Sequence, residues 1–212
     1  SRVLRRLTED YYRPPKKGRL ITIEGIDSSG KTVQSHLLHM KLLQTIGAVP
    51  FEFPNYLNKT GAFIKSIVGG AIDYSSHTWA CLMAANRYED RHDLLNSLRF
   101  TNVVTNRYTP SNLVYSTACG IDSQWLSTLD SQMPKPNMVI VLDVPVEVSV
   151  LRKTERDIIE QDISYLRKVR ATYTHIASTK GWYVVDGTGA PEVVHSDIMK
   201  LVNDEFQWNI KM

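Results

Sequence analysis

Residues 25–32 read GIDSSGKT and satisfy the pattern G-x-x-x-x-G-K-[ST]. They follow an apolar, strand-like run and precede a helix-like one, the context in which this pattern forms a phosphate-binding loop. Backbone N–H groups and the positive end of the helix then face the anion. Lys31 adds a charge at the β- and γ-phosphates, and the Thr32 hydroxyl can ligate Mg²⁺. The residues predicted to bind a nucleoside triphosphate are Gly25, Ile26, Asp27, Ser28, Ser29, Gly30, Lys31 and Thr32.

A second candidate group follows the strand-like run at 102–106. Arg107 comes directly after it, at the edge of a parallel sheet where ligands bind. Its planar guanidinium suits a phosphate held by two hydrogen bonds. Asn112 and Tyr115 follow on the next helical turns, where they can reach a base or a sugar. The alternative, a surface arginine after a strand, stays open.

A predicted helix places Met83, Arg87 and Arg91 at a spacing of four residues, hence on one face. They can line a ligand site, although a solvated charged helix has the same pattern.

The charge-dense stretch 151–162 contains Arg152, Lys153 and Arg156. As a lid over the triphosphate it would stabilise charge on the transferred phosphoryl group. A solvated junction between two helices is the alternative.

The elements that must position these residues alternate along the chain. Strand-like runs lie at 19–24, 49–53, 102–106, 138–143 and 182–186, and helical stretches at 31–46, 77–98, 145–154, 157–179 and 191–204. Several strand runs are continuously apolar, which is typical of a parallel sheet buried on both faces. We therefore predict one α/β domain, a three-layer P-loop NTPase fold with a five-stranded parallel sheet flanked by helices.

The composition suits such a domain: 212 residues, 42% hydrophobic, 22% charged and a formal net charge of +3. The basic excess lies in residues 1–18, with six basic and two acidic side chains. We predict an extension at 1–18, a P-loop domain at 19–206 with its lid at about 150–162, and a tail at 207–212. The charge is too small to indicate nucleic acid, and no apolar run is long enough for a membrane span. Cys81 and Cys119 match no zinc or disulfide pattern, which favours a cytoplasmic protein with both thiols buried.

The chain resembles the thymidylate kinase family of nucleoside monophosphate kinases from about residue 19 to residue 205. The resemblance rests on six segments in family order: GIDSSGKT, FPNY (53–56), ANRYE (85–89), NRYTPSNLVY (106–115), MPKPNMVIVLDVP (133–145) and VRATYTHIA (169–177). It implies phosphorylation of dTMP by ATP, with Mg²⁺, to give dTDP for dTTP synthesis. It also implies a homodimer.

The resemblance assigns roles by matching position. Asp27 would lie near the 3′-hydroxyl of dTMP and the metal, and Arg107 would hold the 5′-phosphate. Arg87 and Asn112 would bind the pyrimidine, and Tyr115 would pack on the sugar. The implied substrate-binding set is Asp27, Phe53, Tyr56, Met83, Arg87, Asn106, Arg107, Asn112 and Tyr115. Because Ser28 follows Asp27, the catalytic arginine must come from the lid, as Arg156 or Arg152, to act with Lys31, Asp27 and Arg107.

Two departures from the family keep alternatives open. Asn106 stands where the family usually has an aspartate, and an amide carries no charge towards Mg²⁺. Met83 stands where a phenylalanine commonly stacks on thymine, and methionine is less shape-selective. A kinase with broader pyrimidine monophosphate specificity, for dUMP or UMP, and a weakly active nucleotide-binding sensor are the rival hypotheses.

Overall fold

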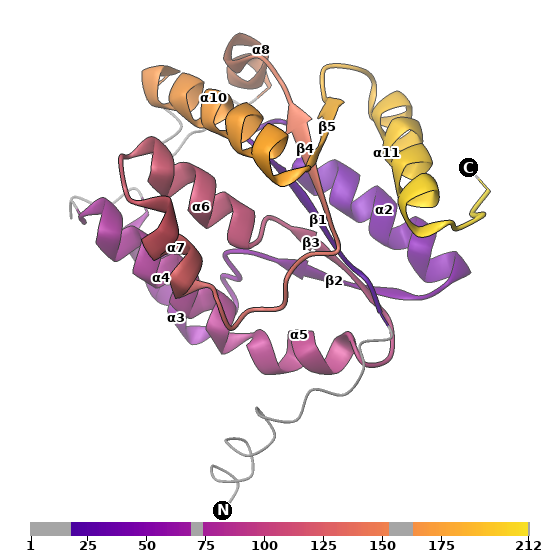
Figure 1. The fold of residues 1–212 in the computed structure, drawn as a ribbon, viewed down its shortest axis with the longest axis horizontal. Coiled ribbons are helices and arrows are strands. Elements are labelled where there is room, and N and C mark those ends of the chain that lie inside the picture. Colours follow the sequence, from indigo (N-terminus) through magenta and orange to yellow (C-terminus); the bar gives the residue numbers. More distant parts are fainter. Residues whose placement is uncertain (1–17, 69–73, 153–162, 212) are drawn as a thin grey trace, which may run out of the picture.

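The computed structural model describes residues 18–68, 74–152 and 163–211. Its centre is one parallel sheet of five strands in the order β2-β3-β1-β4-β5 (Figure 1). The strands are β1 (Leu20–Gly25), β2 (Ala48–Glu52), β3 (Asn102–Asn106), β4 (Met138–Asp143) and β5 (Tyr183–Asp186). The predicted α/β fold with a five-stranded parallel sheet is confirmed.

Helices cover both faces of this sheet, as Figure 1 shows. The helices are α2 (Lys31–Thr45), α3 (Lys59–Ile67), α4 (Ser76–Glu89), α5 (Arg91–Ser97), α6 (Thr109–Ala118), α7 (Ser123–Leu129), α8 (Val146–Leu151), α10 (Ile163–Lys180) and α11 (Pro191–Phe206). Helices α2 and α11 pack on one face, and α6 and α10 on the other. None of the helices in these three ranges is long and apolar enough to cross a bilayer.

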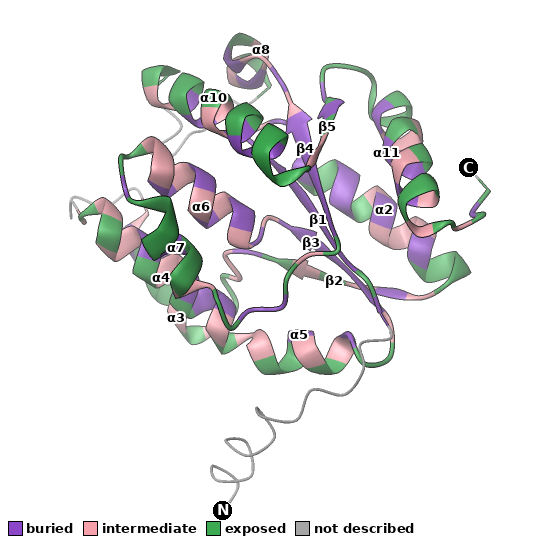
Figure 2. Cartoon of the chain, viewed as in Figure 1, coloured by how far each residue is buried: buried purple, intermediate pink, exposed green. Residues whose placement is uncertain are grey.

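The central strands are buried on both faces, which explains their continuous apolar sequence. In β4, Ile140 and Leu142 face the core under α2 and α11, whereas Val139 and Val141 face α6 and α10. Figure 2 shows the central strands in the buried colour and the outer faces of the helices exposed. Period-two alternation is absent because neither face meets water.

The helix predicted at 77–98 is wrong in extent, because the structure divides it into α4 and α5 at Asp90. The Asp90 carboxylate accepts hydrogen bonds from Asn55 Nδ2 at 2.6 Å and Asn58 Nδ2 at 3.1 Å. These partners lie more than 30 residues away in the sequence, so no local pattern reveals the break.

The sequence prediction lacked α3 and α7. Helix α3 is capped by Asn58, whose side chain accepts from Gly61 N at 2.7 Å. A Cβ at Gly61 would lie 1.7 Å from the Asn55 carbonyl oxygen, so only glycine fits in this first turn. Helix α7 is capped by Asp122, whose side chain accepts from Trp125 N. In both cases the capping residue was the available signal.

Two smaller expectations also differ. The helix expected at 145–154 is the shorter α8, and the part of the next helix expected at 157–162 lies outside the described residues. Cys81 and Cys119 were expected to be buried, but both are exposed. They lie on or just after helices whose other faces supply the contacts with the core.

Candidate active site

The phosphate loop connects β1 to α2 and has an unusual backbone. Gly25, Ser28 and Gly30 have φ angles of +141°, +58° and +98°. A Cβ at Gly25 would lie 2.6 Å from the Leu142 carbonyl oxygen, so β4 requires a glycine there. The loop therefore curves tightly at the carboxyl end of the sheet and leads into the N-terminus of α2.

Lys31 is the first residue of α2, and its side chain is buried. Its Nζ donates a hydrogen bond to the Ile26 carbonyl oxygen at 2.6 Å, which places the ammonium group inside the loop. The helix N-terminus and this ammonium group make the loop suitable for a polyphosphate.

Asp27 connects this loop to the end of β3. Its carboxylate forms an ion pair with the Arg107 guanidinium and accepts a hydrogen bond from Tyr115 Oη at 3.1 Å. The Arg107 guanidinium also lies 5.2 Å from the centre of the Tyr115 ring, within cation–π distance. These three residues come from separate segments and form one polar cluster beside the loop.

Arg107 adopts a left-handed backbone conformation with φ +63°. Its backbone N–H donates to the Ile23 carbonyl oxygen at 3.0 Å, and the next N–H, of Tyr108, donates to Glu24 Oε1 at 2.8 Å. Such a conformation persists where surrounding contacts hold it, and it aims the arginine across the edge of the sheet.

Glu24 is a buried carboxyl that sequence analysis missed. It also accepts hydrogen bonds from Ser111 Oγ at 2.6 Å and Tyr173 Oη at 2.8 Å. Burial raises the pKa of Glu24 above its usual value, against the opposite effects of Ser111, Arg107 and Tyr173. Glu24 thereby fastens α6 and α10 to β1 directly behind the arginine. The available signal was a charged residue inside an apolar strand.

A cavity of about 210 Å³ opens next to the Asp27–Arg107 pair. Eight of the nine predicted substrate-binding residues line it: Asp27, Phe53, Tyr56, Met83, Arg87, Arg107, Asn112 and Tyr115. Trp79, Ser111 and Tyr165 also line it and were not predicted. Residues of α4 and α6 and of the segments that follow β2 and β3 thus meet in one place, although more than 50 positions separate some of them.

Arg87 is held at this cavity by Asp130, a residue that sequence analysis also missed. Arg87 Nε and Nη2 donate to both carboxylate oxygens of Asp130 at 2.7 to 3.0 Å, and both side chains are buried. Asn112 Nδ2 lies 3.4 Å from the same carboxylate and 3.2 Å from the Ala80 carbonyl oxygen. Asp130 therefore fixes the orientation of both predicted base-binding residues.

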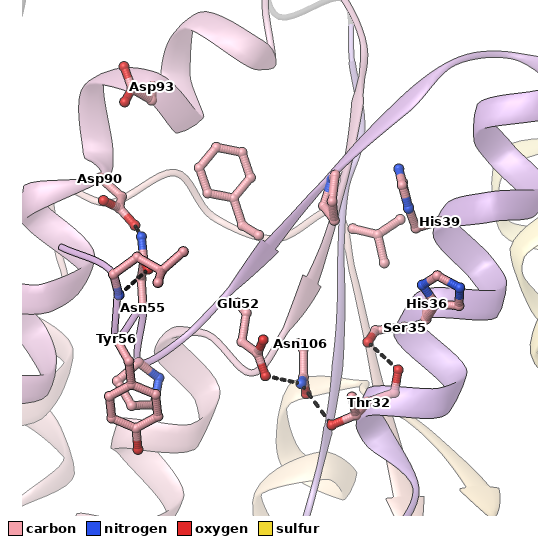
Figure 3. Close-up of a pocket in the computed structure, with 15 residues that line it drawn as sticks. Thr32, Ser35, His36, His39, Glu52, Asn55, Tyr56, Asp90, Asp93 and Asn106 are labelled. Carbon is pink, nitrogen blue, oxygen red and sulfur yellow. Dashed lines mark hydrogen bonds between the residues drawn. The ribbon is translucent and has the colours of Figure 1, made fainter. Parts of the chain in front are cut away.

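Asn106 lines a neighbouring, wider cavity of about 950 Å³, shown in Figure 3. Its Nδ2 donates to Thr32 Oγ1 at 3.1 Å and to Glu52 Oε1 at 2.8 Å. The two cavities share Pro54 and Tyr56.

This donor set fits a magnesium ion that is held largely by ATP. The described residues contain no group of three or more His, Cys, Asp or Glu side chains that could hold a metal. Mg²⁺ in nucleotide sites needs few protein ligands, since phosphates and water supply most of its oxygens. Thr32, with its exposed hydroxyl beside Asn106 and Glu52, meets that need.

Of the two arginines predicted to act from the lid, only Arg152 lies among the described residues. Arg152 ends α8, and its Nη2 donates to the carbonyl oxygens of Gly187 and Thr188 at 3.0 and 3.2 Å. Gly187 in turn packs near the Ser29 carbonyl, so Arg152 lies close to the outer side of the phosphate loop. Arg156 lies outside the described residues.

Comparisons with known proteins identify the family of this chain. The family model "Thymidylate kinase" matches residues 23–198. A probable thymidylate kinase of Methanocaldococcus jannaschii is 33% identical over 84% of this chain and 93% of its own length. The thymidylate kinase of Plasmodium falciparum is 32% identical over 88% of this chain and 90% of its own length. A solved structure of thymidylate kinase from Candida albicans superposes with a TM-score of 0.77 at 21% identity, covering 91% of this chain and 94% of that one.

The fold, the phosphate loop and the adjoining cavity define a P-loop kinase that acts on a small acceptor. The chain belongs to the thymidylate kinase family, whose members are ATP:dTMP phosphotransferases.

Proposed function

We propose that this chain phosphorylates dTMP by direct in-line transfer of the γ-phosphoryl group of ATP, with the residues of the phosphate loop and of the adjoining cavity in the roles given below. The observation that carries these roles is the contact between Asp27 in the loop and Arg107 at the cavity. Because of this contact, the site for the phosphate donor and the site for the phosphate acceptor lie next to each other.

On the donor side, Lys31 and the N-terminus of α2 bind the ATP phosphates. The buried Nζ of Lys31 stabilises the charge that develops on the transferred group. A bound Mg²⁺ ion would supply positive charge that neutralises part of the charge of the ATP phosphates. Thr32 would be the protein ligand of this ion. Asp27 lies on the side of the phosphate loop that faces the acceptor.

On the acceptor side, Arg107 binds the 5′-phosphate of dTMP and Asp27 accepts from the 3′-hydroxyl. Arg87 and Asn112, held by Asp130, donate to the pyrimidine, and Tyr115 packs on the sugar. Phe53, Tyr56 and Met83 supply the apolar lining. Holding both phosphates in line lowers the barrier mainly through positioning, so no covalent intermediate on the protein is needed.

The remaining catalytic charge comes from the lid, as Arg152 or Arg156. Arg152 is placed near the outer side of the loop, where its contacts are two backbone carbonyls that it can exchange for phosphate. Replacing each arginine by alanine separately, and comparing kcat, distinguishes them.

The decisive experiment measures ADP release with ATP–Mg²⁺ and a panel of acceptors: dTMP, dUMP, UMP, CMP, AMP and GMP. We expect turnover with dTMP that Lys31→Ala lowers by a factor of about 10² or more, since one buried charge stabiliser is lost. Lys200→Ala, on the exposed side of α11, is the control and should turn over like the wild type. Unchanged activity of Lys31→Ala would contradict the mechanism.

The panel also tests the rival specificity. Met83 lines the cavity where a rigid ring would select the base shape more strictly, which favours broader pyrimidine use. Comparable kcat/KM for dUMP or UMP would support that reading. ATP binding without turnover on any acceptor would instead support a nucleotide sensor.

We also propose that the chain acts as a homodimer in the cytoplasm. Its kinase domain would span residues 19–206, between the basic extension at 1–18 and the tail at 207–212.

A further inference from the structure

Glu52 lies beside the P-loop threonine, although it comes from a different strand and outside any nucleotide-binding motif. It is the last residue of β2 and pairs in register with Asn106 at the end of β3. Asn106 Nδ2 donates to Glu52 Oε1 at 2.8 Å and to Thr32 Oγ1 at 3.1 Å, so one amide group connects the carboxylate to the threonine hydroxyl (Figure 3).

In sites of this kind a carboxylate commonly accompanies the loop threonine at the magnesium ion. In P-loop enzymes the Mg²⁺ of the nucleotide is held by the loop Ser or Thr together with an acid on a neighbouring strand. Asn106 occupies that place at the end of β3 but carries no charge. Asp27, the acid inside the loop, is engaged by Arg107 and Tyr115. Asn106 donates hydrogen bonds to both Thr32 and Glu52, so Glu52 is the carboxylate that is connected to the loop threonine.

The hydrogen bonds of Asn106 fix the direction of its amide. Both partners accept from the NH₂ end, while Oδ1 is buried and has no hydrogen-bond partner among the described residues. A reversed amide would place two oxygens against each other at Glu52. Asn106 therefore orients the carboxylate instead of supplying charge itself.

The space around Glu52 suits a hydrated ion. Its side chain is exposed and lines the 950 Å³ cavity together with Thr32 and Asn106. Mg²⁺ keeps several of its waters in nucleotide sites, so a carboxylate can act on it through a water as well as directly.

We propose that Glu52 supplies the carboxylate charge for the Mg²⁺ of bound MgATP, with Asn106 as the residue that positions it. The acidic group of the site then lies at the end of β2, beside the uncharged Asn106 at the end of β3. This inference rests on the proposed function, because it requires ATP in the phosphate loop.

The test is the gain in ATP affinity that a divalent metal confers, measured by calorimetry with Mn²⁺ and, separately, with a chelator. Mn²⁺ replaces Mg²⁺ because both prefer oxygen ligands. Four proteins are compared with the wild type: Glu52→Gln, Asn106→Asp, the double variant Glu52→Gln/Asn106→Asp, and Asp93→Asn. Asp93 lines the same cavity from α5, away from Asn106 and Thr32, and serves as the matched removal of one charge (Figure 3).

We expect Glu52→Gln to reduce the metal-dependent gain roughly 10- to 100-fold. The affinity for ATP in the chelator should stay unchanged, because glutamine keeps the hydrogen bond to Asn106. The double variant, which returns the acid to β3, should recover most of the gain. Asn106→Asp alone should keep a gain at least as large as that of the wild type, and Asp93→Asn should match the wild type.

The outcomes separate the two proposals. If the wild type binds no ATP, either with Mn²⁺ or with the chelator, the proposed function is wrong. If it binds ATP equally well under both conditions, the role of Glu52 is overturned, because there is no metal-dependent gain for it to supply. If the wild type shows the gain and Glu52→Gln keeps it, or Asp93→Asn loses as much, only the role of Glu52 is overturned. A gain that is lost in Glu52→Gln and not recovered in the double variant would show a general effect on the end of β2, and would also overturn it.

Discussion

Asp130 is the residue on which the geometry of the base-binding side depends. It takes three hydrogen bonds from Arg87 in a buried ion pair and lies within reach of Asn112. A buried charge that loses its partner is strongly destabilising. Asp130 thus positions Arg87 and Asn112, the two residues predicted to bind the base, although Asp130 does not itself line the cavity.

We expect Asp130→Asn to lower the free energy of unfolding by about 3 kcal/mol, because the Arg87 guanidinium stays buried without a counter-charge. The KM for dTMP should rise more than kcat falls, since Arg87 and Asn112 lose their orientation. Urea denaturation and steady-state kinetics measure the two effects. The control is Glu147→Gln, which breaks the exposed pair with Arg167 and should change neither. An unchanged KM in Asp130→Asn would show that Arg87 does not read the base.

At the scale of elements, the segment between β2 and α3 is attached to α4 through hydrogen bonds of asparagine side chains. Asn86 is fully buried in α4, accepts from Asn55 N at 2.7 Å, and donates to the Asn55 carbonyl and to Asn58 Oδ1. These bonds place Phe53 and Tyr56 at the cavity. They also lie next to Asp90, where α4 ends.

Replacing Asn86 by alanine should lower the free energy of unfolding by about 2–3 kcal/mol, because several buried polar groups lose their partners. It should also raise the KM for dTMP, as the segment with Tyr56 is no longer fixed. Asn96→Ala, at an exposed position of α5, is the control. Equal stability of the two variants in chemical denaturation would contradict the prediction.

The packing of α11 on α2 carries a pH dependence. Burial, and then the charge of Lys41, lower the pKa of His195 below its usual value. Its Nδ1 is buried without a hydrogen-bond partner among the described residues. Because the folded state binds the proton less readily than the unfolded state, stability is present above about pH 6.5 and is lost as the pH falls.

We therefore expect the wild type to lose more stability between pH 7.5 and pH 5.5 than a His195→Gln variant does. The measurement is the midpoint of urea unfolding for both proteins at each pH. His175→Gln removes an exposed histidine of α10 and should retain the pH dependence of the wild type. Parallel curves for the wild type and His195→Gln would exclude this source of pH dependence.

At the scale of the whole molecule, the resemblance to the family leads us to expect a homodimer with a two-fold axis. Light scattering of the full chain should give twice the mass of one chain at the concentrations used for kinetics. A mass equal to one chain, together with full activity, would contradict the expectation.

The sequence by itself determined what depends on short stretches of chain. The phosphate loop, the five strands and most helix positions follow from short stretches of sequence, because a loop motif, continuous apolar runs and helical spacing indicate them. The positions of Arg107, Asn112 and Tyr115 relative to β3 follow in the same way. The order in which the motifs occur was enough to indicate the family.

Only the tertiary structure decided which side chains act on which. The acids Glu24, Glu52 and Asp130 contact Ser111, Asn106 and Arg87, which lie 87, 54 and 43 residues away from them in the sequence. The end of α4 at Asp90 depends likewise on asparagines from another segment. Such pairings arise when the folded sheet brings distant chain segments to one edge, and no local pattern records them.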